Sequence, residues 1–282
     1  MSKLKKALEK AKEAREFDDH NLSVSQKKAK SISGDIQNNS GYRSEIDVYY
    51  SKTKIAKIDD DVLRKGKVIS LFHDIEKIDQ IKTLRTQVLS YLNKTGGNSI
   101  LITSANPYEG KTFTAINLGA SIAQELDRTV LLVDADLRNH SGVHKDFSMD
   151  FFGTDMAEGL SNYLLGQVDI PDILINPGVN RLVLLPGGRP LPNSAELLGS
   201  PRMVMLVNDI KSRYADDRII IFDSSSLLTS ADPLVLSRFV DGILIVVEEE
   251  RTKKEDLKKV MELLIDKPII GTVMNKTKSV MN

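Results

Sequence analysis

Hydrophobic residues follow two different patterns along this chain of 282 residues. From residue 99 onward, short apolar and β-branched runs alternate with stretches of helical spacing, whereas the first 66 residues show little sustained apolar period. Continuous apolar strands joined by crossover helices are typical of a mainly parallel sheet covered on both faces. The pattern predicts an α/β domain of this kind over residues 67–282, preceded by a helical and flexible N-terminal segment over residues 1–66.

Six apolar runs predict the strands of that sheet: Ser99–Thr103, Val130–Val133, Leu182–Leu185, Ile219–Phe222, Gly242–Val247 and Ile269–Met274. Helices between the strands are expected to begin near Lys111, Ser194, Asp232 and Lys253. A further helix is predicted from Asp74 to about Leu92, where apolar residues recur at helical spacing. Ligands bind such sheets at the carboxyl ends of the strands. The residues that directly follow these runs are therefore the place to look for chemistry.

The N-terminal segment contains one helical pattern, Ser2–Phe17, and a polar span from about Asp18 to Gly66 that we interpret as mostly linker. The opening residues lack the long apolar run of a secretory signal, and no apolar stretch approaches the roughly 20 residues of a membrane-spanning helix. Lys plus Arg and Asp plus Glu both total 39, so no global field attracts nucleic acid. The absence of cysteine excludes disulfides and thiol catalysis. These features indicate a cytoplasmic protein without a nucleic-acid partner.

The first predicted strand leads into a loop that ends in Gly110-Lys111-Thr112. The segment Ala105-x-x-x-x-Gly110-Lys111-Thr112 matches a phosphate-binding P-loop, except that alanine replaces the first glycine. Such a loop needs a strand, a tight turn with inward N–H groups and a helix N-terminus directed at phosphate. We expect Lys111 to reach the β- and γ-phosphates of ATP and the Thr112 hydroxyl to bind Mg²⁺.

Aspartates follow two further strands. Asp134 and Asp136 come after one apolar run, with Arg138 two residues on, and Asp223 follows another run. A single aspartate at a strand end is usually a turn or helix cap, but three beside a P-loop are hard to explain as caps. Mg²⁺ prefers carboxylates, phosphates and retained waters. The sequence therefore predicts a metal site formed by Thr112, Asp134 and Asp223.

These residues resemble those of the bacterial tyrosine kinases (BY-kinases) of exopolysaccharide assembly, in the deviant P-loop class that also contains ParA- and MinD-type ATPases. The resemblance spans about Asp74 to Lys278. Asp134-Ala135-Asp136-x-Arg138 is similar to the family's second nucleotide motif, and Asp223 to its Walker B aspartate. GGRPLPNSAELLGSPRM is similar to a family segment in which Ser194 here replaces a proline. KALEKA and GKTFTAINLGASIA look most like the cytosolic autokinases encoded beside exosortase (PEP-CTERM) loci.

The resemblance implies an ATP- and Mg²⁺-dependent tyrosine autokinase that regulates exopolysaccharide synthesis, export and chain length. It implies catalytic roles for Lys111, Asp134, Asp136 and Arg138, with either Asp134 or Asp136 helping to deprotonate the incoming tyrosine. The implied nucleotide-binding residues are Glu109, Gly110, Lys111, Thr112, Phe113 and Asn275, the last of them at adenine. The implied partners are further copies of the chain and the cytoplasmic tail of a membrane polysaccharide chain-length regulator, which would recruit the kinase to the inner membrane.

The sequence departs from the family pattern in several places. Tyr108 replaces a glycine of the loop, and Ser224 and Ser225 replace two prolines after the Walker B aspartate. An oligomerisation motif with two arginines reads Asp79-x-x-Lys82-x-x-Arg85 here, and an exposed charged helix face is the alternative interpretation. The residues GTVMNKTKSVMN contain no tyrosine cluster. Tyr49-Tyr50 are therefore the preferred phospho-acceptors, with an apolar anchor for the linker as the alternative.

Two other functions fit the same motifs. A regulatory P-loop ATPase would switch its assembly state without phosphorylating a protein. A ParA/MinD-like positioning ATPase is disfavoured, because the signature lysine of that branch is missing from Ala105-Asn106-Pro107.

Overall fold

The structure is a computed structural model that describes residues 53–56, 58–72, 78–138, 151–153, 158–213 and 217–278. All of these residues lie in one compact unit, Ser44–Asn282. The predicted helix Ser2–Phe17 and the candidate acceptors Tyr49 and Tyr50 lie outside the described residues. Within the part of the chain that is described, no helix is both long enough and apolar enough to cross a membrane.

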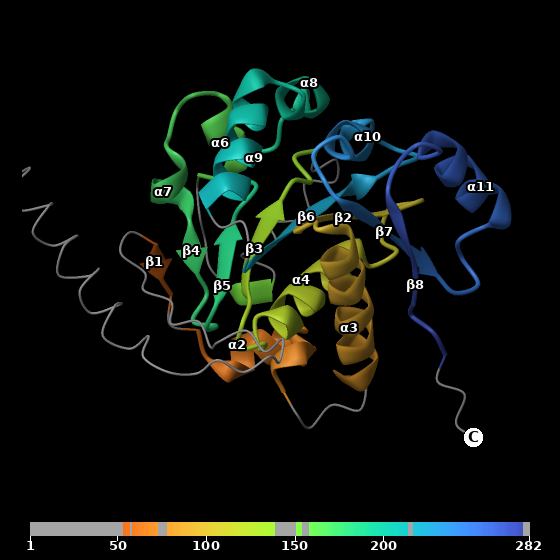
Figure 1. The fold of residues 1–282 in the computed structure, drawn as a ribbon, viewed down its shortest axis with the longest axis horizontal. Coiled ribbons are helices and arrows are strands. Elements are labelled where there is room, and N and C mark those ends of the chain that lie inside the picture. The colour runs from red at the N-terminus through yellow and green to blue at the C-terminus, as the bar shows by residue number, and fades with distance from the viewer. Residues whose placement is uncertain are drawn as a thin grey trace, which may run out of the picture. The chain divides into compact units, whose positions relative to one another are not determined.

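An eight-stranded sheet forms the centre of the unit, in the order β1-β4-β5-β3-β6-β2-β7-β8 (Figure 1). Neighbouring strands run parallel, except that β4 and β5 are antiparallel. The strands are β1 (Lys54–Ile55), β2 (Ser99–Ser104), β3 (Thr129–Asp134), β4 (Ile175–Asn176), β5 (Leu182–Leu185), β6 (Arg218–Ser226), β7 (Gly242–Glu248) and β8 (Ile269–Asn275). The predicted mainly parallel sheet is confirmed.

Helices cover both faces of this sheet (Figure 1). They are α2 (Asp60–Lys65), the 3₁₀ helix η1 (Ile69–Leu71), α3 (Ile78–Thr95), α4 (Lys111–Ile122), α6 (Leu160–Leu164), α7 (Ile170–Ile173), α8 (Ser194–Leu198), α9 (Pro201–Arg213), α10 (Asp232–Leu236) and α11 (Lys254–Leu263). The described helices that begin at Lys111, Ser194 and Asp232 do so where the sequence predicted, and α11 begins one residue after Lys253.

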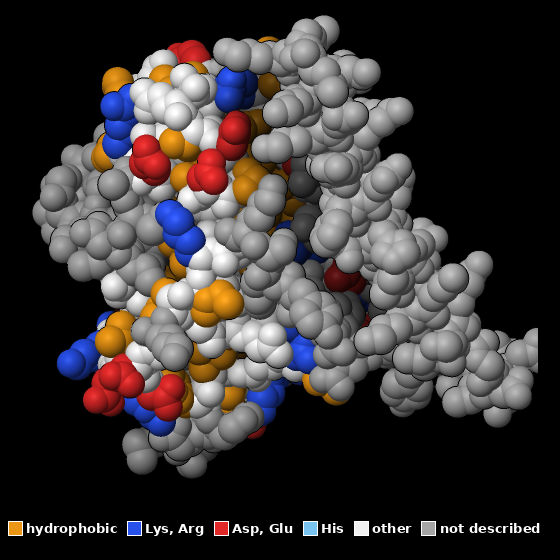
Figure 2. All heavy atoms as spheres, turned by 90° about the vertical axis from the view of Figure 1, so that its left-hand side faces the viewer, with side chains coloured by type: hydrophobic (Ala, Val, Ile, Leu, Met, Phe, Trp, Pro, Cys, Tyr) orange, Lys and Arg blue, Asp and Glu red, His pale blue; other side chains and the backbone are white. Residues whose placement is uncertain are grey.

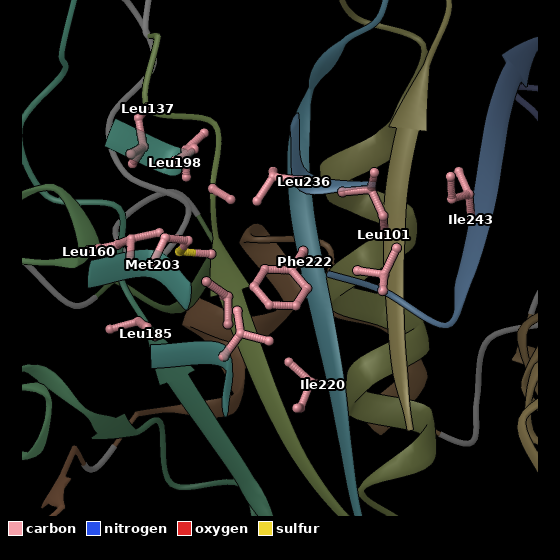
Figure 3. Close-up of a cluster of buried hydrophobic side chains, with 14 of the residues drawn as sticks. Leu101, Leu137, Leu160, Leu185, Leu198, Met203, Ile220, Phe222, Leu236 and Ile243 are labelled. Carbon is pink, nitrogen blue, oxygen red and sulfur yellow. The ribbon is translucent and has the colours of Figure 1, made fainter. Parts of the chain in front are cut away.

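Two hydrophobic clusters fill the space between the sheet and its helices. Successive side chains of a strand point to opposite faces, and in β2 Leu101 joins one cluster while Ile100 and Ile102 join the other. α3 and α4 pack on the Ile100 side, whereas α6, α8, α9, α10 and α11 pack on the Leu101 side. Figure 3 shows the Leu101 cluster, in which Phe222 lies among side chains from several strands and helices. Both faces of the central strands are thus buried, which is why those strands read as continuous apolar runs.

The predicted linker contains structure in its described part. β1 pairs with β4, and Leu63 of α2 is buried in the Ile100 cluster. Just beyond the predicted boundary at residue 66, the Ser70 N–H donates to Asn117 Oδ1 at 3.1 Å, and the Ser70 hydroxyl donates to the Asn117 carbonyl at 2.8 Å. Strands of two residues, such as β1 and β4, are too short to show an alternating pattern. The boundary at residue 66 stays a prediction, but residues before it pack on the domain.

Candidate functional site

The carboxyl ends of three adjacent strands form the candidate site. β6 lies between β3 and β2 in the sheet. Asp223 of β6 is in register with Asp134 at the end of β3 and with Ile102 near the end of β2. The loop after β2 is the predicted P-loop, so the sheet order brings together the three segments that the sequence singled out.

Gly110 is the N-cap of α4 and has a φ of 95°, in the left-handed region that favours glycine. A Cβ at this position would lie 1.8 Å from Asn275 Nδ2. Both the backbone conformation and the space therefore require glycine here. The first turn of α4 carries Lys111, Thr112 and Phe113, and a helix N-terminus with free N–H groups is an anion-binding position.

Lys111 lies over the aspartates at the strand ends. Its Nζ is 3.6 Å from Asp136 Oδ2, and its side chain is largely buried. Asp136 is the more accessible partner, with 33% of its side chain exposed, whereas Asp134 is buried. The Asp136 backbone N–H donates to Asp134 Oδ1 at 3.1 Å, which fixes the Asp134 carboxylate against the backbone at Asp136.

The carboxyl group of Asp223 has the most strongly shifted pKa in the site. It is buried, and among the described residues its Oδ1 has no hydrogen-bond partner. Burial raises the pKa of Asp223 to about 7, and the nearby Lys111 charge and the Thr112 hydroxyl offset this effect only in part. An unpaired carboxylate oxygen in a buried position is costly unless a cation or donor satisfies it.

The donor set fits a magnesium–nucleotide complex. Mg²⁺ is usually held by one or two carboxylates, phosphate oxygens and waters rather than by an all-protein cage. Asp134 and Asp223 lie on neighbouring strands, and the Thr112 hydroxyl donates to Asp223. No group of three or more His, Cys, Asp or Glu residues that could hold a metal by itself occurs in the described ranges. The predicted ligands Thr112, Asp134 and Asp223 are thus near one another.

A loop that the site prediction did not include also borders Asp134. Gly187 follows β5 closely, and a Cβ there would lie 3.1 Å from Asp134 Oδ2. The Leu191 N–H donates to the Leu137 carbonyl at 2.8 Å, which ties this loop to the Asp134–Arg138 segment. The signal in the sequence is the pair Gly187-Gly188 just after an apolar strand.

Ser194, which replaces a proline of the family pattern, has a partner of its own in the fold. Its hydroxyl donates to the buried Asp232 carboxylate at 2.7 Å.

The structure also places three other predicted site residues, two of which have hydrogen-bond partners. Glu109 is fully buried, and its carboxylate accepts from the Asn106 N–H at 2.9 Å and the Thr252 hydroxyl at 2.6 Å. Asn275 Nδ2 donates to the Glu109 carbonyl at 3.0 Å, so this side chain contacts the loop. Arg138 lies in the turn after Asp136 and is partly exposed. The Glu109 carboxylate is thus occupied by contacts with Asn106 of the loop and with Thr252.

The chain has relatives among named kinases, although no family model matches it. It is 33% identical over 202 residues to the tyrosine-protein kinase YwqD of Bacillus subtilis, covering 71% of this chain and 81% of that protein. It is 34% identical over 182 residues to the tyrosine-protein kinase CpsD of Streptococcus agalactiae, covering 64% of this chain and 75% of the relative. In the putative tyrosine-protein kinase EpsB of Ralstonia solanacearum, the match covers 26% of the relative's length.

Solved structures agree with these relatives. The kinase domain of the Escherichia coli tyrosine kinase ETK superposes with a TM-score of 0.66 at 27% identity, covering 76% of this chain and 83% of that one. The fold is shared more widely, since MinD from Pyrococcus horikoshii, solved with Mg-ADP, gives a TM-score of 0.50 at 23% identity over 63% of this chain and 69% of the other. Strand-end aspartates beside a P-loop and the similarity to YwqD lead to one assignment: the chain belongs to the bacterial tyrosine-protein kinases.

Proposed function

We propose that this kinase binds ATP–Mg²⁺ at the carboxyl ends of β2, β3 and β6 and transfers the γ-phosphoryl group to tyrosine on another copy of the chain. The observation that carries the proposal is the buried Asp223 carboxyl, whose Oδ1 lacks a hydrogen-bond partner within the described ranges although Lys111 and Thr112 lie beside it. A cation between Asp223 and the nucleotide would satisfy that oxygen.

The residues of the site have different proposed roles, which follow from their positions. Lys111 and the N–H groups at the start of α4 neutralise phosphate charge, which is the main contribution of a protein to phosphoryl transfer. Thr112, Asp134 and Asp223 would hold Mg²⁺, which when bound would offset the negative charge of the phosphates. We also propose that Phe113, in the first turn of α4, and Asn275 bind the nucleotide, with Asn275 at adenine, and that Arg138 has a catalytic role.

Asp136 is the better placed of the two candidate bases. Its side chain is 33% exposed, whereas Asp134 is buried and accepts the Asp136 N–H. In the proposed step the tyrosine hydroxyl loses its proton to Asp136 as its oxygen bonds to the γ-phosphorus. The bond from that phosphorus to the β–γ bridging oxygen breaks, and ADP leaves.

The acceptors are proposed to be Tyr49 and Tyr50, which lie outside the described residues. Two described tyrosines are held in place, since the Tyr91 hydroxyl donates to the Asp241 carbonyl at 3.4 Å and the Tyr163 hydroxyl to the Arg202 carbonyl at 3.4 Å. A tyrosine packed in this way enters a neighbour's site only after local unfolding. Phosphotyrosine would add about −1.5 to −2 charges and push neighbouring subunits apart.

Transfer between copies of the chain requires self-association. Only part of the predicted oligomerisation motif in α3 lies on the surface, where it could contact another copy. Lys82 pairs with Asp79 at 3.4 Å on the exposed surface, but Arg85 turns inward. Arg85 forms an ion pair of 2.7 Å with Glu125 and donates to the Ser121 carbonyl at 3.0 Å. We propose that copies contact one another through Asp79 and Lys82, with Arg85 holding α3 on α4.

The proposed setting is the synthesis and export of an exopolysaccharide. The resemblance supports a cytoplasmic kinase recruited to the inner membrane by the cytoplasmic tail of a membrane chain-length regulator, and membership of the exosortase-linked subgroup stays a prediction. No nucleic-acid partner is proposed, and acidic and basic side chains are interspersed on the face shown in Figure 2.

Phosphotyrosine mapping after incubation with ATP–Mg²⁺ tests the proposal, with and without the tail of the regulator. We expect Tyr49→Phe with Tyr50→Phe to hydrolyse ATP normally while losing most phosphotyrosine, and Tyr163→Phe, the matched control, to keep it. Undiminished phosphotyrosine in the double variant would exclude these acceptors. ATP hydrolysis without any phosphotyrosine, even with the tail present, would favour a regulatory ATPase instead.

A further inference from the structure

Tyr108 occupies an unusual backbone conformation in the P-loop. Its φ is 68°, in the left-handed region that residues with a Cβ seldom adopt. Such a conformation persists only when surrounding contacts enforce it. The Tyr108 side chain is 55% exposed, so packing of its ring is not the main constraint. The backbone of the loop must therefore be held by other residues.

Two consecutive side chains, one at the end of β8 and the other directly after it, hold two consecutive carbonyls of the loop. Lys276 Nζ donates to the Tyr108 carbonyl at 2.7 Å, and Asn275 Nδ2 donates to the Glu109 carbonyl at 3.0 Å. In a planar trans peptide, the C=O and the following N–H point in opposite directions. Fixing these carbonyls on the β8 side turns the N–H groups of Glu109 and Gly110 the other way, as a phosphate-binding loop requires.

Lys276 is itself held in position. Its Nζ forms an ion pair of 2.9 Å with Glu248 at the end of β7, and Glu248 also pairs with Arg251 at 3.2 Å. The hydrogen bond from Lys276 lowers the pKa of Glu248, so this carboxylate is charged at neutral pH. The Glu248 N–H donates to the Thr252 hydroxyl at 2.8 Å, and that hydroxyl donates to the Glu109 carboxylate at 2.6 Å. The same turn therefore supports both Tyr108 and Glu109.

We propose that Lys276 is a positioning residue of the phosphate loop: held by Glu248, it fixes the Tyr108 carbonyl and so keeps the loop N–H groups directed at the nucleotide phosphates. The inference rests on the proposed nucleotide site and adds to it a residue that contacts the loop, not the nucleotide. Because Lys276 is exposed, its removal changes loop geometry more than it changes the stability of the fold.

A double-mutant cycle with position 108 tests this role. Glycine adopts positive φ without a Cβ penalty, so a loop with Tyr108→Gly needs less support from Lys276. We expect Lys276→Met to weaken ADP–Mg²⁺ binding roughly five- to tenfold in the wild-type background and about twofold or less in the Tyr108→Gly background. The matched control is Lys278→Met, because Lys278 makes a comparable surface ion pair of 2.6 Å with Glu250.

Isothermal titration with ADP and Mg²⁺ measures these affinities, and thermal unfolding checks that the variants fold equally well. An equal loss in both backgrounds would mean that Lys276 contacts the nucleotide directly, which overturns the proposal. Unchanged affinity in Lys276→Met, with Lys278→Met also unchanged, would overturn it as well while leaving the nucleotide site intact. Failure of the wild-type protein to bind ADP–Mg²⁺ would remove the nucleotide site and this inference together.

Discussion

Two aspartates at opposite ends of the same parallel sheet show how one fold separates function from stability. Asp223 lies at the carboxyl ends of the strands, is buried, and its Oδ1 finds no hydrogen-bond partner in the described part of the chain. Asp241 lies just before β7, at the amino ends, and its Oδ2 accepts from the N–H groups of Asn98 and Ser99, both at 3.0 Å, and from the Ser99 hydroxyl at 2.6 Å. Lys211 adds an ion pair of 3.1 Å.

The pKa values of the two carboxyls move in opposite directions. Burial raises the pKa of Asp223 to about 7. Burial also acts on Asp241, but the hydrogen bonds from Ser99 and Asn98 and the charge of Lys211 outweigh it and lower its pKa below 3.8. A charged group that the fold satisfies stabilises the fold, whereas a charged group that the fold leaves unsatisfied is stabilised by a ligand. The comparison predicts that changes at the carboxyl ends alter binding and that changes at the amino ends alter stability.

The largest effect is expected from Lys111→Met. The substitution keeps the length of the side chain but removes the charge that faces the phosphates. Loss of a charge-assisted contact should weaken nucleotide binding by about 2–3 kcal/mol, with little change in urea denaturation. Titration calorimetry with ADP–Mg²⁺ measures the first quantity. Wild-type affinity and ATP hydrolysis in this variant would contradict the assignment of the P-loop.

Asp223→Asn should weaken Mg²⁺-dependent binding while making the unliganded protein more stable. The folded pKa of about 7 lies above the ordinary value of 3.8, so the folded state binds more protons between these values. The penalty of the charged carboxyl is therefore absent below about pH 4 and grows as pH rises to about 8. Removing it should add on the order of 1–3 kcal/mol at pH 8 and almost nothing at pH 4.

Urea denaturation across this pH range, with a chelator present, checks the sign of that effect. A variant that is equally destabilised at pH 4 and pH 8 would show that Asp223 is a structural group like Asp241. Binding of ADP with unchanged Mg²⁺ dependence in the same variant would place the metal elsewhere.

Asp241→Asn should have the smallest effect and the opposite pH dependence. The lowered folded pKa means that the stabilisation by the Asp241 carboxylate is fully present above the unfolded value of 3.8 and is lost as pH falls through the folded pKa. The variant should lose about 1–2 kcal/mol of stability at pH 7 and progressively less below pH 4. Its affinity for ADP–Mg²⁺ should match that of wild type. A large loss of affinity would show that the two ends of the sheet are coupled.

Much of the fold was accessible from the sequence, because central strands buried on both faces leave uninterrupted apolar runs. Leu182–Leu185 was predicted with its observed bounds, and the run at Ile219–Phe222 proved to be part of the first half of Arg218–Ser226. That strand extends through Ser224, which donates to the Ile102 carbonyl at 3.0 Å, so polar residues continue a buried strand by bonding to its neighbour. The spacing of apolar residues therefore does not reveal where polar residues extend a buried strand.

Only the main residues of the candidate site could be predicted from the sequence. Lys111, Asp134, Asp136 and Asp223 follow apolar runs, and parallel strands bring their carboxyl ends to one edge of the sheet, so their proximity follows from the pattern. The inward turn of Arg85 toward Glu125 does not follow from it, because the spacing of α3 residues fixes only which of them share a helix face.

The sequence by itself determined that this chain forms a parallel sheet with a P-loop and acidic strand ends, because strand and loop signals lie within a few neighbouring residues. Only the tertiary structure decided that Asp223 has a raised pKa, that Gly187 borders Asp134, and that Lys276 holds the Tyr108 carbonyl. Lys276 and Tyr108 are 168 residues apart along the chain. Desolvation and hydrogen bonding depend on which distant segments the fold brings within about 3 Å, and local patterns carry no such information.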